Sequence, residues 1–222
     1  MATIFLDRDG VINENRPDCV KSWSEFRFLP GSREAIAKLT QAGHRLVVCT
    51  NQAGVARGTI SLEAVYEIHR KMLDSIHEVG GKIEQVYFCP HEKEGDCDCR
   101  KPRPGMLLRA RDELGLDMRG AVLIGDSITD IRAALAAGIY GVLVLSGLGL
   151  EQLCTHYHEA NGPFRLALDL QHATELIVKG LYLPTGPRSS LERACSTFLG
   201  LPERVDSLPP LQEQELAASL ST

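Results

Sequence analysis

Short apolar runs rich in β-branched residues alternate with amphipathic stretches along the first two thirds of the chain. Five of these runs have the length of buried strands and are bounded by turn residues; they cover residues 3–6, 45–49, 85–89, 121–125 and 141–145. Strands that alternate with helices favour a parallel sheet covered by helices on both faces. The pattern therefore predicts a three-layer α/β fold with a doubly wound, Rossmann-like parallel sheet.

Between the predicted strands, apolar residues recur at helical spacing and residues that favour helix ends flank them. Ser32 is a candidate N-cap for the first helix, and Ser61 is a candidate N-cap for the second. The apolar positions of the second helix fall on one face, and a glycine pair follows its last turn. Two further helices are expected at 105–114 and 129–137.

The alternation of strands and helices weakens after the fifth strand. Residues 167–179 favour one more strand or turn followed by a helix. The C-terminal stretch is rich in Pro and Ser and mixes Leu with Glu. We therefore expect one domain over 1–183 and a poorly packed tail over 184–222, with short helices near 191–199 and 212–220.

Composition excludes some classes of protein. The chain has 222 residues, of which 44% are hydrophobic and 24% charged, with a formal net charge of -5. This length suits one α/β domain, and the charge gives no sign of nucleic-acid binding. A charged residue interrupts the N-terminus before a signal peptide could form, and no stretch has the length of a membrane span. We expect a cytoplasmic monomer with neither nucleic acid nor membrane as partner.

Two carboxylates follow the first predicted strand. Asp7 and Asp9 are two residues apart, so both can face one point, and Gly10 lets the chain turn away. Phosphoryl transfer uses such a pair: Asp7 would attack phosphorus, and Asp9 would protonate the leaving oxygen and later activate water. The first proton transfer requires an Asp9 pKa above the ordinary value of about 3.9, which crowding by Asp7 would supply. The alternative is a merely polar turn.

Polar residues also follow other predicted strands. Thr50 comes after the second strand and Asp126 after the fourth. Because the carboxyl ends of parallel strands share one edge of the sheet, where ligands bind in open α/β folds, these residues are expected to meet Asp7.

Four segments resemble the motifs of the haloacid dehalogenase superfamily, in the order of that family. They are FLDRDGV at 5–11, CTNQ at 49–52, CRKP at 99–102 and IGDSITD at 124–130. The resemblance implies a capless phosphatase of this family that works through an aspartyl-phosphate intermediate. The short segments between the motifs also leave no room for a large cap domain.

The resemblance also assigns roles within this site. Thr50 and Lys101 would stabilise the transferring phosphoryl group. Mg²⁺ would be held by Asp7, the backbone carbonyl of Asp9 and Asp126, with Asp130 in support.

A cysteine-rich loop supplies a second set of metal ligands. Of seven cysteines, three lie with one histidine in the zinc loop, residues 89–99, as Cys89, His91, Cys97 and Cys99. Four such ligands within eleven residues are typical of a closed, tetrahedral and therefore structural Zn²⁺ site, with free thiols as the alternative. A second cluster of Cys and His, at 154–158, lacks a fourth ligand and is expected to be ordinary surface.

The zinc loop is similar to that of the histidinol-phosphatase-like subgroup. Two stretches, TNQAGVARG at 50–58 and CRKPRPGM at 99–106, resemble the heptose 1,7-bisphosphate 7-phosphatases of that subgroup. This implies hydrolysis of the 7-phosphate of D-glycero-D-manno-heptose 1,7-bisphosphate, in the biosynthesis of ADP- and GDP-heptose precursors. The implied substrate contacts are Thr50, Asn51, Gln52, Ala53, Arg100 and Lys101.

Alternatives to this function remain. Residues 15–18 depart from the family pattern where the sugar is bound. Histidinol phosphate or another small sugar or polyol phosphate could be the substrate. A catalytically idle binding protein is the alternative of another class.

Overall fold

A computed structural model describes residues 1–181 of the 222-residue chain. The tail predicted at 184–222, with its helices near 191–199 and 212–220, lies outside the described residues. The boundary at residue 183 therefore stays a prediction.

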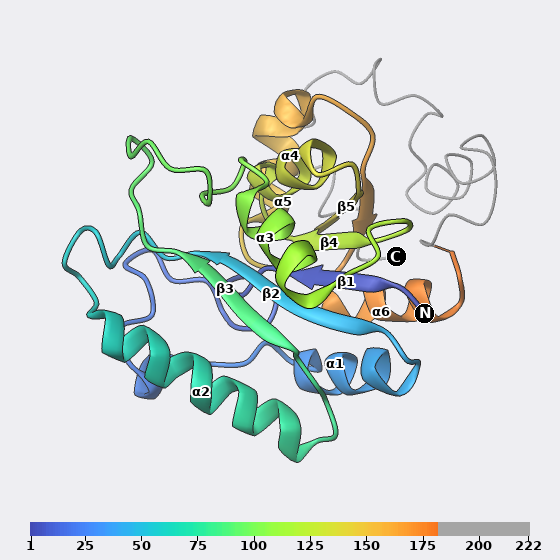
Figure 1. The fold of residues 1–222 in the computed structure, drawn as a ribbon, viewed down its shortest axis with the longest axis horizontal. Helices are drawn as coiled ribbons and strands as arrows, with labels where there is room; N and C mark the ends of the chain where they lie inside the picture. Colours follow the sequence, from blue (N-terminus) through green and yellow to red (C-terminus); the bar gives the residue numbers. More distant parts are fainter. Residues whose placement is uncertain (182–222) are drawn as a thin grey trace.

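Six parallel strands form one sheet in the order β3-β2-β1-β4-β5-β6 (Figure 1). Their bounds are β1 Thr3–Leu6, β2 Arg45–Asn51, β3 Gln85–Cys89, β4 Val122–Gly125, β5 Tyr140–Val144 and β6 Arg165–Ala167. The five predicted strands are confirmed to within two residues at each end. β6 is the additional strand that the sequence favoured only as a strand or turn.

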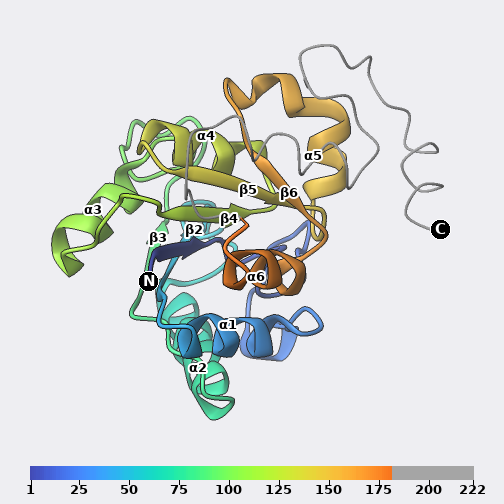
Figure 2. The ribbon, with the colours of Figure 1, turned by 90° about the vertical axis from the view of Figure 1, so that its right-hand side faces the viewer.

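Helices cover both faces of the sheet, with α1, α2 and α6 on one side and α3, α4 and α5 on the other (Figure 2). The helices are α1 Ser32–Gln41, α2 Leu62–Glu78, α3 Gly105–Leu114, α4 Ile128–Ala136, α5 Gly149–His156 and α6 Leu170–Val178, with 3-10 turns η1 Trp23–Glu25 and η2 Tyr157–Ala160. The predicted three-layer, doubly wound architecture is confirmed.

The central strands are buried on both faces, and alternation along them divides the core in two. In β1, Ile4 and Leu6 pack in the cluster that includes α1, α2 and α6, whereas Phe5 packs in the cluster that includes α3 and α4. Because successive side chains of a strand point to opposite faces, one short apolar run serves both layers.

The two predicted helix caps have different outcomes. Ser61 is confirmed, since its Oγ accepts a hydrogen bond of 3.2 Å from the Ala64 N–H. The prediction for Ser32 is wrong, because Gly31, with φ of 70°, takes the cap position. Ser32 instead lies inside the helix, where its hydroxyl donates to the Ile12 carbonyl at 2.8 Å. This bond ties α1 to the loop that follows β1.

The sequence did not predict α5. Gly149 is its only buried residue, so the helix lacks the apolar stripe by which the others were recognised. The Cys and His cluster at 154–158 lies in α5 and η2, and its side chains form no metal-ligand group within residues 1–181.

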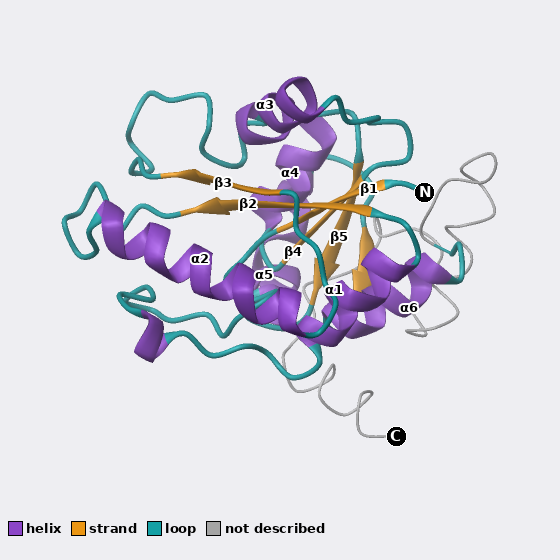
Figure 3. Cartoon of the chain, turned by 60° about the horizontal axis from the view of Figure 1, so that its bottom comes forward, coloured by secondary structure: helices purple, strands orange, loops and turns teal. Residues whose placement is uncertain are grey.

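No cap domain interrupts residues 1–181. Between β1 and α1 the chain forms loops and η1, and between β2 and α2 it forms one turn-rich loop (Figure 3). None of the helices in this part of the chain is long and apolar enough to cross a membrane.

Replacing Leu39 by Ala tests the core beneath α1. Leu39 is 0% exposed, and its truncation is expected to lower the free energy of unfolding by about 2 to 5 kcal/mol, through lost burial and a cavity. Denaturant titration followed by circular dichroism measures this change. The matched control is Lys38→Ala, an exposed neighbour on the same helix, which should change stability by less than about 0.5 kcal/mol. Equal effects of the two substitutions would contradict the described packing.

Candidate active site

A cavity of about 240 Å³ opens at the carboxyl edge of the sheet. Its wall combines residues at or just after the ends of β1, β2 and β4, including Asp7, Asp9, Thr50 and Asp126. The expectation that these strand ends share one site is therefore confirmed. The strand order explains this, because β1 pairs with β2 on one side and β4 on the other.

Lys101 is a buried cation that contacts Asp7, a residue of the cavity wall. Its Nζ lies 2.9 Å from Asp7 Oδ1 and 2.5 Å from Asp130 Oδ1, and it donates to the Cys49 carbonyl at 2.7 Å. The residue is only 3% exposed. Burial alone would lower the pKa of Lys101, but the two carboxylates outweigh burial and raise it. Lys101 is thus a fixed positive charge against Asp7.

The two carboxylates that contact Lys101 belong to a cluster of three. Ligand oxygens of Asp7, Asp126 and Asp130 all lie within 4.8 Å of one another. Burial and then the charges of Asp7 and Asp130 raise the pKa of Asp126 well above its ordinary value. Burial likewise raises the pKa of Asp130 to about 6. The hard oxygen donors and the excess of negative charge both fit a divalent cation such as Mg²⁺.

Asp126 and Asp130 also have fixed partners in the protein. Asp126 Oδ2 accepts a 2.9 Å hydrogen bond from the Leu148 N–H. Asp130 Oδ2 accepts from the Ser127 N–H at 3.1 Å, which completes a capping box at the start of α4. Asp130 therefore connects the first turn of α4 to Lys101.

Gly10 makes room for Asp126. Its φ of +79° lies in the left-handed region, and a Cβ there would stand 1.9 Å from Asp126 Oδ2. The predicted turn after Asp9 is confirmed, and the close approach adds a steric reason for glycine.

The polar residues at the end of β2 bind one another and the loop that carries Lys101. Asn51 exchanges two hydrogen bonds of 3.1 Å with the backbone of Lys101. Gln52 Nε2 donates to Thr50 Oγ1 at 3.0 Å and to Asp9 Oδ2 at 2.8 Å. All three residues line the cavity, but the amide of Asn51 is engaged in holding Lys101.

Asp9 lies in a set of hydrogen-bond donors. Arg8 Nη2 reaches its two oxygens at 3.0 and 2.9 Å, and Asn13 and Gln52 each donate to it at 2.8 Å. Burial would raise the pKa of Asp9, but Arg8 and these hydrogen bonds outweigh burial and lower it. The expectation of a pKa raised by Asp7 is therefore wrong for the free protein, because the nearest charge is the cation of Arg8.

Sequence reasoning missed several residues of the site. Arg8 and Asn13 are buried behind Asp9, and Asn15 and Arg16 line the cavity in the segment that departed from the family pattern. His69 contacts Arg8 from α2. The sequence signal that could have identified His69 is its position, as a polar residue, on the apolar face of the second predicted helix.

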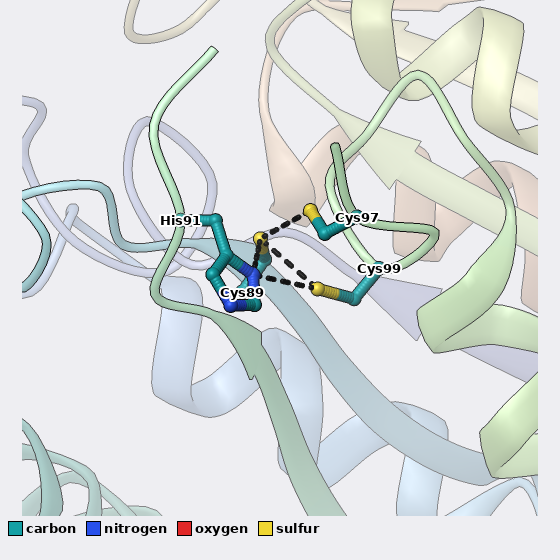
Figure 4. Close-up of side chains that lie close together, drawn as sticks. All are labelled: Cys89, His91, Cys97 and Cys99. Atoms are coloured by element: carbon teal, nitrogen blue, oxygen red, sulfur yellow. Dashed lines mark hydrogen bonds between the residues drawn. The ribbon is translucent and has the colours of Figure 1, made fainter. Parts of the chain in front are cut away.

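The four predicted zinc ligands converge at the end of β3 (Figure 4). Cys89 Sγ lies 3.7 Å from Cys97 Sγ and 3.2 Å from Cys99 Sγ, while His91 Nδ1 lies 3.3 Å from Cys99 Sγ. A tetrahedral centre with Zn–S bonds of about 2.3 Å separates two sulfurs by roughly 3.8 Å. The cluster therefore has the donor set and the size of a zinc site.

Charge also favours a metal in this cluster. Burial and then the neighbouring thiols raise the pKa of Cys99 to about 12. Burial would raise the pKa of Cys97, but hydrogen bonds from the Arg100 backbone and the neighbouring thiols outweigh burial and lower it. A bound metal would displace the proton of Cys99, which otherwise stays protonated at neutral pH. Arg100 donates to the His91 carbonyl at 3.0 Å, so the basic pair at 100–101 is coupled to the zinc loop.

Comparison with known proteins identifies close relatives. Residues 98–173 match the family described as HAD-hydrolase-like. A D-glycero-beta-D-manno-heptose-1,7-bisphosphate 7-phosphatase of Pseudomonas aeruginosa is 43% identical over 150 residues, which cover 68% of this chain and 84% of that protein. The enzyme of the same name from Neisseria meningitidis serogroup A is 42% identical over 159 residues, covering 72% and 85%.

A solved structure agrees with these relatives. The D,D-heptose 1,7-bisphosphate phosphatase of B. bronchiseptica, crystallised with magnesium and phosphate, superposes with a TM-score of 0.76 at 38% identity. The match covers 81% of this chain and 99% of that one. Together with the strand-end carboxylates and the Cys and His cluster, these relatives show that the chain belongs to the D-glycero-beta-D-manno-heptose-1,7-bisphosphate 7-phosphatase family of haloacid dehalogenase-like hydrolases.

Proposed function

We propose that the protein is a Mg²⁺-dependent phosphatase that hydrolyses the 7-phosphate of D-glycero-D-manno-heptose 1,7-bisphosphate. The observation that carries this proposal is the buried ion pair between Asp7 and Lys101, beside Asp126 in an open cavity. The relatives named for this reaction support the choice of substrate.

Asp7 is the nucleophile. The Arg8 N–H and Lys101 Nζ both bind its Oδ1, at 2.8 and 2.9 Å. These bonds fix the carboxylate plane, so that one oxygen can attack phosphorus as the leaving alcohol departs, which forms an aspartyl-phosphate. Lys101 and Thr50 stabilise the negative charge on the transferring phosphoryl group.

Asp9 transfers the protons. It is a carboxylate in the free protein, and the negative charge of an arriving phosphate raises its pKa, so it enters the first step protonated. It gives that proton to the leaving oxygen. As a carboxylate again, it takes a proton from the water that attacks the aspartyl-phosphate.

Asp7, the backbone carbonyl of Asp9 and Asp126 would hold Mg²⁺. Asp130 supports this site through Lys101 and the start of α4. When bound, the metal neutralises charge on the phosphate and on the clustered carboxylates.

Charge at the cavity rim favours a bisphosphate over histidinol phosphate. Arg16, Arg57 and Arg100 all line the cavity around the phosphate site. They would attract a second phosphate, whereas the amine of histidinol phosphate would meet like charge. We further propose Thr50, Asn51, Gln52, Ala53 and Arg100 with Lys101 as substrate contacts.

Zn²⁺ on Cys89, His91, Cys97 and Cys99 would be structural. All four ligand positions are filled by the protein, so no open position remains for substrate. Its effect on catalysis is indirect, through the loop that carries Lys101. A cytoplasmic location and a monomeric state also stay predictions.

Replacing Asp7 by Asn tests the nucleophile. Phosphate release from heptose 1,7-bisphosphate is expected to fall by about 10³-fold or more, because an amide cannot form the aspartyl-phosphate. Asp74→Asn, an exposed carboxylate on α2, is the control and should keep full activity. Unchanged turnover by the Asp7 variant would refute this role. Faster turnover of histidinol phosphate by the wild type would refute the substrate assignment.

Mg²⁺ is expected to raise the melting temperature by several degrees. Saturation at about 100 times the dissociation constant adds roughly 2.7 kcal/mol of stability. Asp126→Asn should remove most of this shift and, by relieving carboxylate repulsion, should leave the metal-free protein at least as stable. Asp112→Asn, on the surface of α3, should keep the shift. Differential scanning calorimetry measures both, and an undiminished shift in the Asp126 variant would argue against this site.

Elemental analysis of purified protein is expected to find about one zinc per chain. Cys97→Ser should abolish binding of zinc. It should also lower turnover, because the loop before Lys101 is then no longer stabilised by the metal. Cys154→Ser, outside the cluster, should retain the metal. Zinc retained by the Cys97 variant would contradict the ligand assignment.

A further inference from the structure

Arg8 lies between Asp7 and Asp9 in the sequence, and its cationic side chain is buried. Its side chain is 0% exposed, although its neighbour Asp9 is 23% exposed and lines the cavity. A buried guanidinium is costly unless its charge and its N–H groups are matched. The carboxylate of Asp9 is the ion-pair partner that matches the charge within residues 1–181.

Two further contacts of the Arg8 guanidinium are to neutral acceptors. Nη2 donates to Gln52 Oε1 at 3.0 Å, and Nη1 lies 3.0 Å from His69 Nε2. Because a guanidinium only donates, His69 Nε2 must be the acceptor, which places the ring proton on Nδ1. Burial and then the charge of Arg8 lower the pKa of His69 to about 3, in keeping with a neutral ring.

His69 is itself held firmly in α2. It is 5% exposed, and its ring lies 5.5 Å from the ring of Phe88 at an interplanar angle of 64°. A chain of contacts thus runs from α2 through His69 and Arg8 to Asp9 at the cavity wall. Every member except the last is shielded from solvent.

We propose that His69 and Arg8 are positioning residues that fix the orientation of the Asp9 carboxyl group for proton transfer to the leaving oxygen. This inference rests on the proposed role of Asp9 as acid and base. Arg8 binds both oxygens of Asp9. The contact of its Nη1 with His69 Nε2 keeps the guanidinium plane from turning away from Asp9. Proton transfer needs a donor within hydrogen-bond reach, so a small displacement of Asp9 slows that step.

The test compares leaving groups during the first turnover. A sugar phosphate needs a proton from Asp9, whereas 4-nitrophenyl phosphate releases a stable anion that needs none. His69→Phe keeps the ring but removes the acceptor for Arg8. The sugar phosphate used is the one that the wild type hydrolyses fastest. In the His69→Phe variant we expect its first-turnover rate, measured by rapid quench, to fall about 10- to 100-fold. The rate of the nitrophenolate burst should fall less than about 3-fold.

Further variants separate positioning from folding. His69→Gln offers a side-chain carbonyl to Arg8 and should restore most of the rate. His77→Phe, exposed on the same helix, should leave both rates unchanged. If His69→Phe fails to fold, His69→Leu is measured in its place. Equal losses with both substrates, or no rescue by Gln, would overturn the inference.

A double-mutant cycle with Asp9→Asn distinguishes this inference from the proposed function. If His69 acts through Asp9, His69→Phe should cause no further loss in the Asp9→Asn background. If Asp9→Asn itself spares the sugar phosphate, the proposed role of Asp9 fails. If Asp9→Asn is selective for the sugar phosphate and His69→Phe is not, only the positioning role fails.

Discussion

The structure of the site depends on the ammonium group of Lys101, which balances the negative charge of buried carboxylates. The ammonium group contacts buried carboxylates that follow β1 and lie in the first turn of α4, and its third partner is a carbonyl of β2. Removing a buried cation from such a cluster leaves unpaired charge in a low-dielectric environment. Two features hold the lysine in place: the amide of Asn51 binds its backbone, and the cysteine cluster shapes the loop before it.

The two aspartates after β1 have opposite electrostatic surroundings despite their proximity. Asp7 faces Lys101 and the other carboxylates, where a bound cation would balance the excess negative charge. Asp9 faces Arg8 and two amides, where its own charge is already balanced. This separation suits the two roles that we propose, because a nucleophile must stay ionised while an acid and base changes its protonation state.

The strand ends and the convergence of the Cys and His cluster could be predicted, because each depends on residues close together in sequence. Ser61 behaves as its local pattern predicts, whereas Ser32 does not, since a distant carbonyl competes for its hydroxyl. The pKa of Asp9 could not be predicted from the Asp pair alone. It depends on Gln52, 43 residues away, and on the side chain of Arg8, whose direction is set by His69.

The strand order ties catalytic competence to completion of the whole sheet. β1 lies in the middle, and the carboxylate that completes its site, Asp126, belongs to the far half of the chain. Pairings of such high sequence separation form late, because chain entropy is lost before they stabilise anything. A nascent or partly unfolded chain therefore carries the aspartate without the lysine or the metal ligands. Such a chain lacks the groups that would make the aspartate reactive, so it would not react with phosphates before folding is complete.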